Sequence, residues 1–393
     1  MGPVHRAPSE VRTCRKPTAD GGMRVLLLQT QAENAGAQEI ARLLAAGLAD
    51  RGHDIRQIFF YRRTAAFDGD ERTVFCATAR PTGPRALARL LWGLGREIRR
   101  FRPDVVLCFQ HYGNVIGAPL ARLAGVRHVI ANQNSAGAVV AAPVRTADRW
   151  LGCLGVYSRI VAVSGEAAAE FKDHPRAYRS RLMRIDHGVA VKRSLLDRKG
   201  ARIRFGLPVR PTVLGCAARL HQTKQLDAAV RLLPLNPTWH LALAGQGPDA
   251  ARLRALARDL ACAERLHLLG ELGAEDIADF FAALDVFVFP SLAETFGIAA
   301  VEAAQAGVPV VANHLPVLRE VLSVAGEPCA VFVDASDPAA FGAAVAGLVA
   351  APGRAAEMAA RGRRLAARYP VDAMVEAYDS LVRDLGAKQA AAP

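Results

Sequence analysis

The 393-residue sequence has no apolar run approaching the roughly 20 residues that a bilayer-spanning helix requires. We therefore expect a protein that does not cross a membrane, which leaves attachment to a membrane surface open. The first 22 residues are rich in Arg, Pro, Gly and Asp and lack the apolar stretch of a secretory signal. We expect residues 1–22 to form a disordered extension, with Met23 as a candidate for the true start.

The cysteines offer neither a disulfide framework nor a zinc site. There are seven, an odd number, and none forms a C-x-x-C pair. They lie among apolar residues, as Cys108 does between Leu107 and Phe109. This pattern predicts reduced thiols in a hydrophobic core and is typical of a cytoplasmic protein.

What is present is an ordinary globular composition, with 51% hydrophobic and 22% charged residues. The length is sufficient for two domains with separate cores. Short apolar runs alternate with helix-compatible segments, which predicts an α/β fold of parallel sheets flanked by helices. The expected strands are residues 24–29, 56–61, 104–109, 128–132, 159–163, 212–217, 239–244, 265–270, 286–289 and 308–312.

The most informative stretch is residues 285–313. Pro290 stops an apolar strand, a helix-compatible segment follows, and Gly307 sits where a left-handed helix cap is expected. Ligands of parallel sheets bind outside the carboxyl ends of the strands, so the loop 291–297 lies where a ligand is expected. The helix beginning near Thr295 offers unpaired backbone N–H groups that suit an anion such as a diphosphate.

Two glutamates, Glu294 and Glu302, bracket this helix start with seven residues between them. They follow Pro290-Ser291, and Gly-Val-Pro-Val-Val-Ala comes after them. This segment resembles the donor-site signature of the retaining GT-B glycosyltransferases of family 4. The resemblance implies that Glu294 is catalytic and binds donor-sugar hydroxyls, and that Glu302 binds the ribose of the nucleotide. A carboxylate suits both roles because it accepts two hydroxyl hydrogen bonds at once.

Further matches in the second half of the chain involve the diphosphate and the nucleotide. The segment from Arg219 to Lys224 resembles the family's Gly-Arg-Leu-x-x-x-Lys-Gly, in which the Arg and Lys bind the donor diphosphate; Ala218 and Gln225 replace its two glycines. Two fixed cations would stabilise the charge that grows on a leaving diphosphate. The resemblance adds Thr295, Phe296 and Gly297 to the diphosphate site, and Gly270, Glu271 and Leu272 to the nucleotide site.

The first half of the chain matches the family less specifically. Gly36 and Ala37 stand at the Gly-Gly-x-Glu start of the first helix, with Ala37 in place of the second glycine, and should form a loop at the cleft. His111 follows an expected strand and matches the family's active-site histidine, whose ring faces the donor sugar. His187 stands where the family has Asn in an Asn-Gly-Val-Asp turn, so no catalytic role is assigned to it.

The resemblance implies a GT-B fold, in which two Rossmann-like parallel-sheet domains face each other across a cleft and a C-terminal helix crosses back to the first domain. Polar and basic residues 192–210 are the expected linker. The expected parts are a disordered extension (1–22), an N-terminal acceptor-side domain (23–200), a C-terminal nucleotide-sugar donor domain (201–370), a helix crossing back (371–386) and a tail (387–393).

The implied activity is transfer of a sugar from a nucleotide diphosphate sugar, with retention of anomeric configuration. The first donor candidate is a UDP-sugar. A sugar, glycan or glycolipid would be the acceptor, in the synthesis of cell-surface polysaccharide, lipopolysaccharide or glycolipid. A sugar-nucleotide epimerase of the same fold and a non-catalytic sugar-nucleotide-binding module are the alternatives. The donor half has no Asp-x-Asp pair near a strand end, so we expect neither a metal nor another cofactor.

The positive charge is confined to one half of the chain. Residues 1–200 contain 32 Lys and Arg against 17 Asp and Glu, a net charge of +15, whereas the remainder has a net charge of −2. An anionic membrane surface, an anionic polysaccharide acceptor or nucleic acid would explain it. No aromatic residues are interleaved with the basic ones, so we expect no nucleic acid partner. We expect a cytoplasmic protein, either free or attached to the inner face of the membrane.

One helix carries much of this charge, at residues 85–101. Its apolar residues recur at helical spacing, which favours packing in the core over contact with a membrane. They are Leu87, Leu90, Leu91, Leu94 and Ile98, with Trp92 in addition, and they are set against Arg85, Arg89, Arg96, Arg99 and Arg100.

Overall fold

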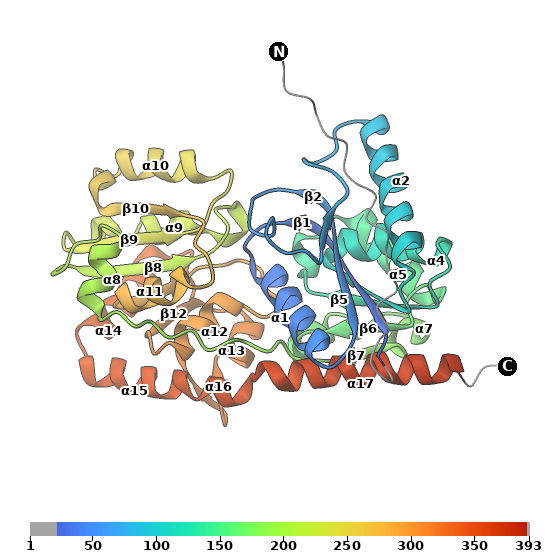
Figure 1. Cartoon of the computed structure of the whole chain (residues 1–393). Helices are drawn as coiled ribbons and strands as arrows, with labels where there is room; N and C mark the ends of the chain where they lie inside the picture. The colour runs from blue at the N-terminus through green and yellow to red at the C-terminus, as the bar shows by residue number, and fades with distance from the viewer. Residues whose placement is uncertain (1–21, 391–393) are drawn as a thin grey trace, which may run out of the picture.

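The structure, a computed structural model, describes residues 22–390. The extension predicted for residues 1–22 lies outside the described residues except for Gly22, and so do the last three residues of the predicted tail. Two units built on parallel sheets lie side by side, one formed by the N-terminal and one by the C-terminal half of the chain (Figure 1).

The N-terminal domain contains a seven-stranded sheet in the order β3-β2-β1-β4-β5-β6-β7, with parallel pairing throughout. Strands β1 and β4 are buried on both faces because crossover helices cover both sides of a parallel sheet, which explains their continuous apolar sequences. The elements are β1 (Arg24–Ala32), α1 (Gly36–Asp50), β2 (Asp54–Arg62), β3 (Thr73–Phe75), α2 (Pro84–Phe101), β4 (Val105–Phe109), α3 (Gln110–Tyr112), α4 (Ala118–Leu123), β5 (His128–Gln133), α5 (Ala142–Cys153), β6 (Arg159–Ala162), α6 (Gly165–Ala169), α7 (Arg176–Arg179) and β7 (Leu182–Arg184).

The C-terminal domain contains a six-stranded parallel sheet in the order β10-β9-β8-β11-β12-β15. Its helices also cover both faces, and one large core runs through it. The elements are α8 (Arg198–Arg204), β8 (Thr212–Ala217), α9 (Leu226–Val230), β9 (Trp239–Ala244), α10 (Ala250–Asp259), β10 (Leu266–Gly270), α11 (Asp276–Ala283), β11 (Val286–Phe289), α12 (Ile298–Gln305), β12 (Val310–Asn313), α13 (Pro316–Val321), β13 (Ser323–Val324), β14 (Glu327–Pro328), β15 (Ala330–Val333), α14 (Pro338–Val349), α15 (Pro352–Arg363), α16 (Leu365–Arg368) and α17 (Val371–Ala390).

Helix α17 crosses from the C-terminal to the N-terminal domain and runs along the latter (Figure 1, red). Its apolar face joins the core beneath α1 and the sheet, where Met374, Val375, Tyr378 and Leu381 are buried. A hydrogen bond of 2.6 Å joins His53 Nε2, in the turn after α1, to the Asp379 carboxylate. The helix predicted to cross back is therefore present.

Most of the expected elements are observed, with a few differences. All ten expected strands are present, and Gly307 adopts the expected left-handed conformation at a φ of 82°. Strands β3, β7, β13, β14 and β15 were not expected; each has only two to four residues, and β3 lies in a segment predicted to be a loop. The expected linker contains the helix α8, which packs on α11 through the Arg202 guanidinium and the Ala283 carbonyl.

Helix α2 has one apolar face, which is buried along most of its length. Leu90, Leu94 and Ile98 are buried as predicted for a core helix, but Trp92 is 67% exposed and Leu87 is 43% exposed. Among the described residues, no single helix is long and apolar enough to cross a membrane. The segments Pro338–Val349 and Pro352–Ala387 reach that length and apolar character only when taken together, and they are bent by 94° relative to each other.

Candidate functional site

A cleft of about 750 Å³ separates the two domains at the carboxyl ends of both sheets. Many of its lining residues lie at or just after the ends of strands, as parallel-sheet topology requires. Glu33 follows β1, Arg219 comes two residues after β8, and Glu271 follows β10. The loop between β11 and α12 and the start of α1 complete the lining.

The start of α12 faces this cleft. Gly297 precedes the helix at a φ of 84°, a left-handed conformation that glycine adopts at low cost. The N–H groups of Ile298 and Ala299 have no hydrogen-bond acceptor among residues 22–390. Phe296 packs its ring against Tyr369, with the ring centroids 5.0 Å apart, so its backbone rather than its side chain is available to a ligand. The helix start is therefore suited to an anion, because its free N–H groups face the cleft.

Both predicted diphosphate-binding cations line the cleft, and each lies close to a carboxylate. Lys224 Nζ is 2.5 Å from Glu294 Oε1. Arg219 is 3.9 Å from Glu33 of the opposite domain, whose carboxylate also pairs with Arg63 at 3.2 Å. Glu294, the predicted sugar-binding residue, is thus adjacent to the predicted diphosphate site.

Glu302 lies deeper in the cleft and is 7% exposed. Its carboxylate pairs with Lys192, at 2.7 Å, on the segment that connects the domains. Burial raises the pKa of Glu302, and the Lys192 ammonium opposes this rise. Glu39 of α1 lies on the other side of Lys192, at 3.9 Å.

The predicted nucleotide-site residues after β10 are only partly in the cleft. Glu271 and Leu272 line it, and Glu271 accepts a hydrogen bond of 2.5 Å from the Asn34 N–H of the opposite domain. Gly270 is not among the lining residues; its carbonyl instead accepts a 2.6 Å hydrogen bond from the Gly245 N–H. Gly36 and Ala37 line the N-terminal side as predicted.

His111 does not line the cleft, although Gln110 directly before it does. The imidazole Nδ1 of His111 lies 3.3 Å from Ser135 Oγ, and burial lowers the pKa of the ring. Gln110 has a φ of 64°, which is unfavourable for a side chain of its size. Hydrogen bonds from its N–H to Asn134 and from the Thr30 N–H to its side chain hold it there.

Several lining residues were not predicted. Glu33 and Asn134 directly follow β1 and β5, which run three residues and one residue further than the expected strands at the ligand-binding edge. Lys192 had no such signal, since it lies in an irregular segment between the domains. His187 is 3% exposed, and burial lowers its pKa to about 4, so the ring is neutral near pH 7.

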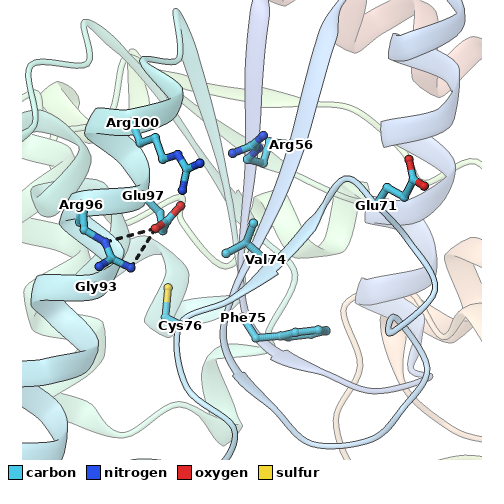
Figure 2. A pocket seen from close by; sticks show the side chains of 9 residues that line it. All are labelled: Arg56, Glu71, Val74, Phe75, Cys76, Gly93, Arg96, Glu97 and Arg100. Carbon is cyan, nitrogen blue, oxygen red and sulfur yellow. Dashed lines mark hydrogen bonds and ion pairs between the residues drawn. The ribbon is translucent and has the colours of Figure 1, made fainter. Parts of the chain in front are cut away.

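A second pocket, of about 390 Å³, lies in the N-terminal domain between α2 and the sheet edge formed by β2 and β3 (Figure 2). Arg96 pairs with Glu97 there at 3.2 Å, while the guanidinium groups of Arg56 and Arg100 point into the same space. The lining of this pocket runs from Arg56, near the beginning of β2, to Cys76, directly after β3, and shares no residue with the lining of the cleft.

The described residues contain no group of three or more His, Cys, Asp or Glu side chains that could hold a metal ion. Arg219 and Lys224 are among the cations that line the cleft.

Two facing parallel-sheet domains, a cleft at their carboxyl edges and a returning C-terminal helix define the GT-B class of fold. Comparison with known proteins agrees with this class. A model of "Glycosyltransferase Family 4" matches residues 35–193, and a model of "Glycosyl transferases group 1" matches residues 197–365. The chain belongs to the family 4, or group 1, glycosyltransferases.

Among its relatives is the GDP-mannose-dependent alpha-(1-6)-phosphatidylinositol monomannoside mannosyltransferase of Mycolicibacterium smegmatis, which is 33% identical over 63% of this chain and 68% of the relative. A D-inositol 3-phosphate glycosyltransferase of Geodermatophilus obscurus is 32% identical over 58% of this chain. The chain spans about half the length of the latter, 54%. The solved structure of Anabaena HepE in complex with UDP and glucose superposes with a TM-score of 0.79 at 17% identity, covering 92% of this chain and 99% of HepE.

Proposed function

We propose that the protein transfers a sugar from a nucleotide diphosphate sugar to a sugar, glycan or glycolipid, with retention of configuration. The first donor candidate is a UDP-sugar. The observation that carries this proposal is the convergence of Arg219, Lys224 and the α12 start on one side of the cleft, with Glu294 beside them. Cations and a helix start fit a diphosphate, and the adjacent carboxylate fits sugar hydroxyls.

The same arrangement suggests how the transfer proceeds. As the bond from the anomeric carbon to the diphosphate breaks, negative charge grows on the leaving oxygen, where Arg219, Lys224 and the N–H groups of α12 would stabilise it. Glu294 would hold the sugar hydroxyls, and Glu302 the ribose. These groups supply the charge that the leaving diphosphate requires, so the mechanism that we propose needs no metal ion. No protein nucleophile is assigned.

Nucleotide binding tests this proposal directly. UDP or GDP should raise the unfolding temperature without added magnesium, because a ligand at 100 times its Kd stabilises a protein by about 2.7 kcal/mol. Absence of a response to any nucleoside diphosphate would contradict the assigned site. Incubation with UDP-sugars alone separates the alternatives: an epimerase converts the sugar without an acceptor, a binding module releases nothing, and a transferase shows at most slow hydrolysis.

We further propose that the acceptor is presented at an anionic membrane surface, at the inner face of the membrane. Two observations support this proposal: the basic N-terminal half, and the exposed Trp92 on the face of α2 that carries Arg89 and Arg96. Arg96 and Arg100 of α2, together with Arg56 of β2, line the second pocket (Figure 2). The name of one relative points the same way, since the Mycolicibacterium smegmatis enzyme is named as a phosphatidylinositol monomannoside mannosyltransferase.

Binding to anionic vesicles tests the membrane proposal. Replacing Arg89, Arg96 and Arg99 together by Gln should weaken binding, by about 1 kcal/mol for each charge near the surface, and salt should weaken binding by the wild type. The matched control replaces three exposed arginines of the C-terminal domain, Arg254, Arg258 and Arg354, by Gln. Equal losses in both triple variants would contradict the assignment to α2.

A further inference from the structure

Lys192 is the residue at which three parts of the molecule meet. It lies on the irregular segment between β7 and α8, and its side chain is only 12% exposed. Its ammonium is 2.7 Å from Glu302 Oε1 on α12 of the C-terminal domain and 3.9 Å from Glu39 Oε1 on α1 of the N-terminal domain. It belongs to none of the motifs by which the sequence resembles its family.

Lys192 acts mainly on Glu302 rather than on Glu39. Glu39 already receives two hydrogen bonds of 2.9 Å from the Arg42 guanidinium. Glu302 Oε1, in contrast, has Lys192 as its only ion-pair partner among residues 22–390, and its Oε2 has no hydrogen-bond partner there. One carboxylate oxygen is therefore fixed by the ammonium, and the other is free to accept from a ligand.

The charge of Glu302 depends on this contact. A buried carboxyl without a cation takes up a proton near neutral pH, because burial disfavours the charged form. The charged groups that face Glu302 are Lys192 and Glu39. Arg42 pairs in turn with Glu39. Arg363 of α15 packs near Gly307, beyond the opposite end of α12. Glu39 repels the charge on Glu302, so Lys192 is the cation that maintains it.

We propose that Lys192 is a positioning residue for the nucleotide, which holds Glu302 as a carboxylate with one oxygen presented to the ribose hydroxyls. This inference rests on the proposed function, since it takes a nucleoside diphosphate as the ligand of the cleft. A carboxylate accepts hydrogen bonds from both ribose hydroxyls, whereas a protonated carboxyl has lost acceptor capacity. Because Lys192 is on the connecting segment, its contact also brings that segment against the nucleotide site.

The affinity for UDP, measured by calorimetry as a function of pH, tests this role. In Lys192→Met the pKa of Glu302 should rise further, so the carboxylate is lost as the pH falls. The ratio of the Kd of this variant to that of the wild type should then increase as the pH is lowered from about 8 to about 6. Below the raised pKa of Glu302, the increase should be up to about tenfold for each pH unit. Taking the ratio removes the protonation of UDP itself, which is the same in both measurements.

Two further variants separate positioning from a structural role. Lys192→Arg keeps the cation and should retain the pH profile of the wild type. In Lys192→Met/Glu302→Gln the titrating group is gone, so the ratio should be independent of pH. Thermal unfolding without ligand gives a second measurement: Lys192→Met should lose stability as pH rises, because a carboxyl with a raised pKa destabilises the folded state when it ionises.

The two ways in which the inference can fail are distinguishable. A pH-independent ratio for Lys192→Met, with UDP binding by the wild type intact, would overturn the role of Lys192 and leave the proposed function in place. A wild type that binds neither UDP nor GDP would overturn the proposed function, and the assignment of Lys192 with it.

Discussion

At the scale of single residues, the two glutamates of the cleft differ in their neighbours, and this difference predicts separate effects. Glu294 pairs with Lys224, and Glu302 pairs with Lys192. Glu294→Gln should lower kcat by one to two powers of ten, because a charged hydrogen bond to the reacting sugar is worth about 1.5–3 kcal/mol. Glu302→Gln should mainly weaken donor binding, since the ribose is held similarly in ground and transition states.

Calorimetry with UDP, which lacks the sugar, distinguishes the two roles. The Glu294→Gln variant should bind UDP at least as well as the wild type, because loss of the Glu294 charge leaves Lys224 free for the diphosphate. The Glu302→Gln variant should bind UDP more weakly. The reverse order of affinities would overturn the assignment of roles, even with the fold and the reaction class unchanged.

Gly245 shows how one residue shapes the diphosphate site. It follows β9 at a φ of 139°, and a Cβ there would lie 2.0 Å from the carbonyl oxygen of Ala218, next to Arg219. Gly245→Ala should therefore destabilise the fold by about 1–3 kcal/mol and weaken UDP binding. Gly347→Ala is the control, since no atom lies within 4 Å of its added Cβ and helix propensity should stabilise it by about 0.5–1 kcal/mol. Urea denaturation of both variants tests this; similar stabilities would contradict the role of Gly245.

At the scale of elements, α17 ties the C-terminal half of the chain to the N-terminal domain. Tyr378 is 1% exposed, and its hydroxyl donates a hydrogen bond to Asn132 Oδ1 of β5. Tyr378→Phe should lower the free energy of unfolding by about 1–3 kcal/mol, because the Asn132 oxygen is left buried without that donor. Tyr112→Phe is the matched control, since Tyr112 is 38% exposed. Equal urea midpoints would show that this hydrogen bond does not stabilise the docked helix.

The elements that could be predicted from the sequence are those whose local pattern and tertiary environment agree. Strands such as Val286–Phe289 are apolar because both faces are buried, so the run itself is a sufficient signal. Strand β3 could not be predicted, because three half-buried residues at a sheet edge leave no periodicity to detect. Helix α8 could not be predicted either, because its basic residues are used in pairs such as Arg202–Asp285, which depend on a segment distant in sequence.

Some residues of the candidate site could be predicted from the sequence and others could not, for the same reason. Arg219, Lys224, Glu294 and Glu302 could be predicted from a motif, and all four line the cleft. The position of His111 at a strand end indicated the right region, but the left-handed turn at Gln110 brings Gln110 rather than His111 to the cleft lining. Lys192 could not be predicted, because only the packing of the connecting segment between α1 and α12 brings it to Glu302.

At the scale of the whole molecule, direct contacts between the domains hold the cleft in the conformation described. On one side, Glu271 of the C-terminal domain accepts from the Asn34 N–H and lies 3.4 Å from Thr64 Oγ1. On another, Glu320 of α13 accepts from the N–H groups of Gly165 and Glu166, at 2.9 and 2.8 Å. These contacts are polar, and apolar residues also meet across the boundary, as Ile298 of α12 does where it packs against the N-terminal core. Removing polar contacts should shift the balance between closed and open forms.

Glu320 is the better place to alter this balance, because it does not line the cleft. Glu320→Ala removes both hydrogen bonds and the ion pair with Arg184 at 2.8 Å. Each charged hydrogen bond is worth about 1.5–3 kcal/mol, so the ratio of closed to open forms should fall by at least about tenfold. Small-angle X-ray scattering should then show a larger radius of gyration for the ligand-free variant. A nucleoside diphosphate that bridges the domains should restore the smaller radius.

Glu357→Ala replaces an exposed acid on α15; it is the control and should leave the radius of gyration unchanged. If the Glu320 variant keeps the radius of the wild type without ligand, contacts other than this pair hold the domains together, and the buried face of α17 becomes the element to test.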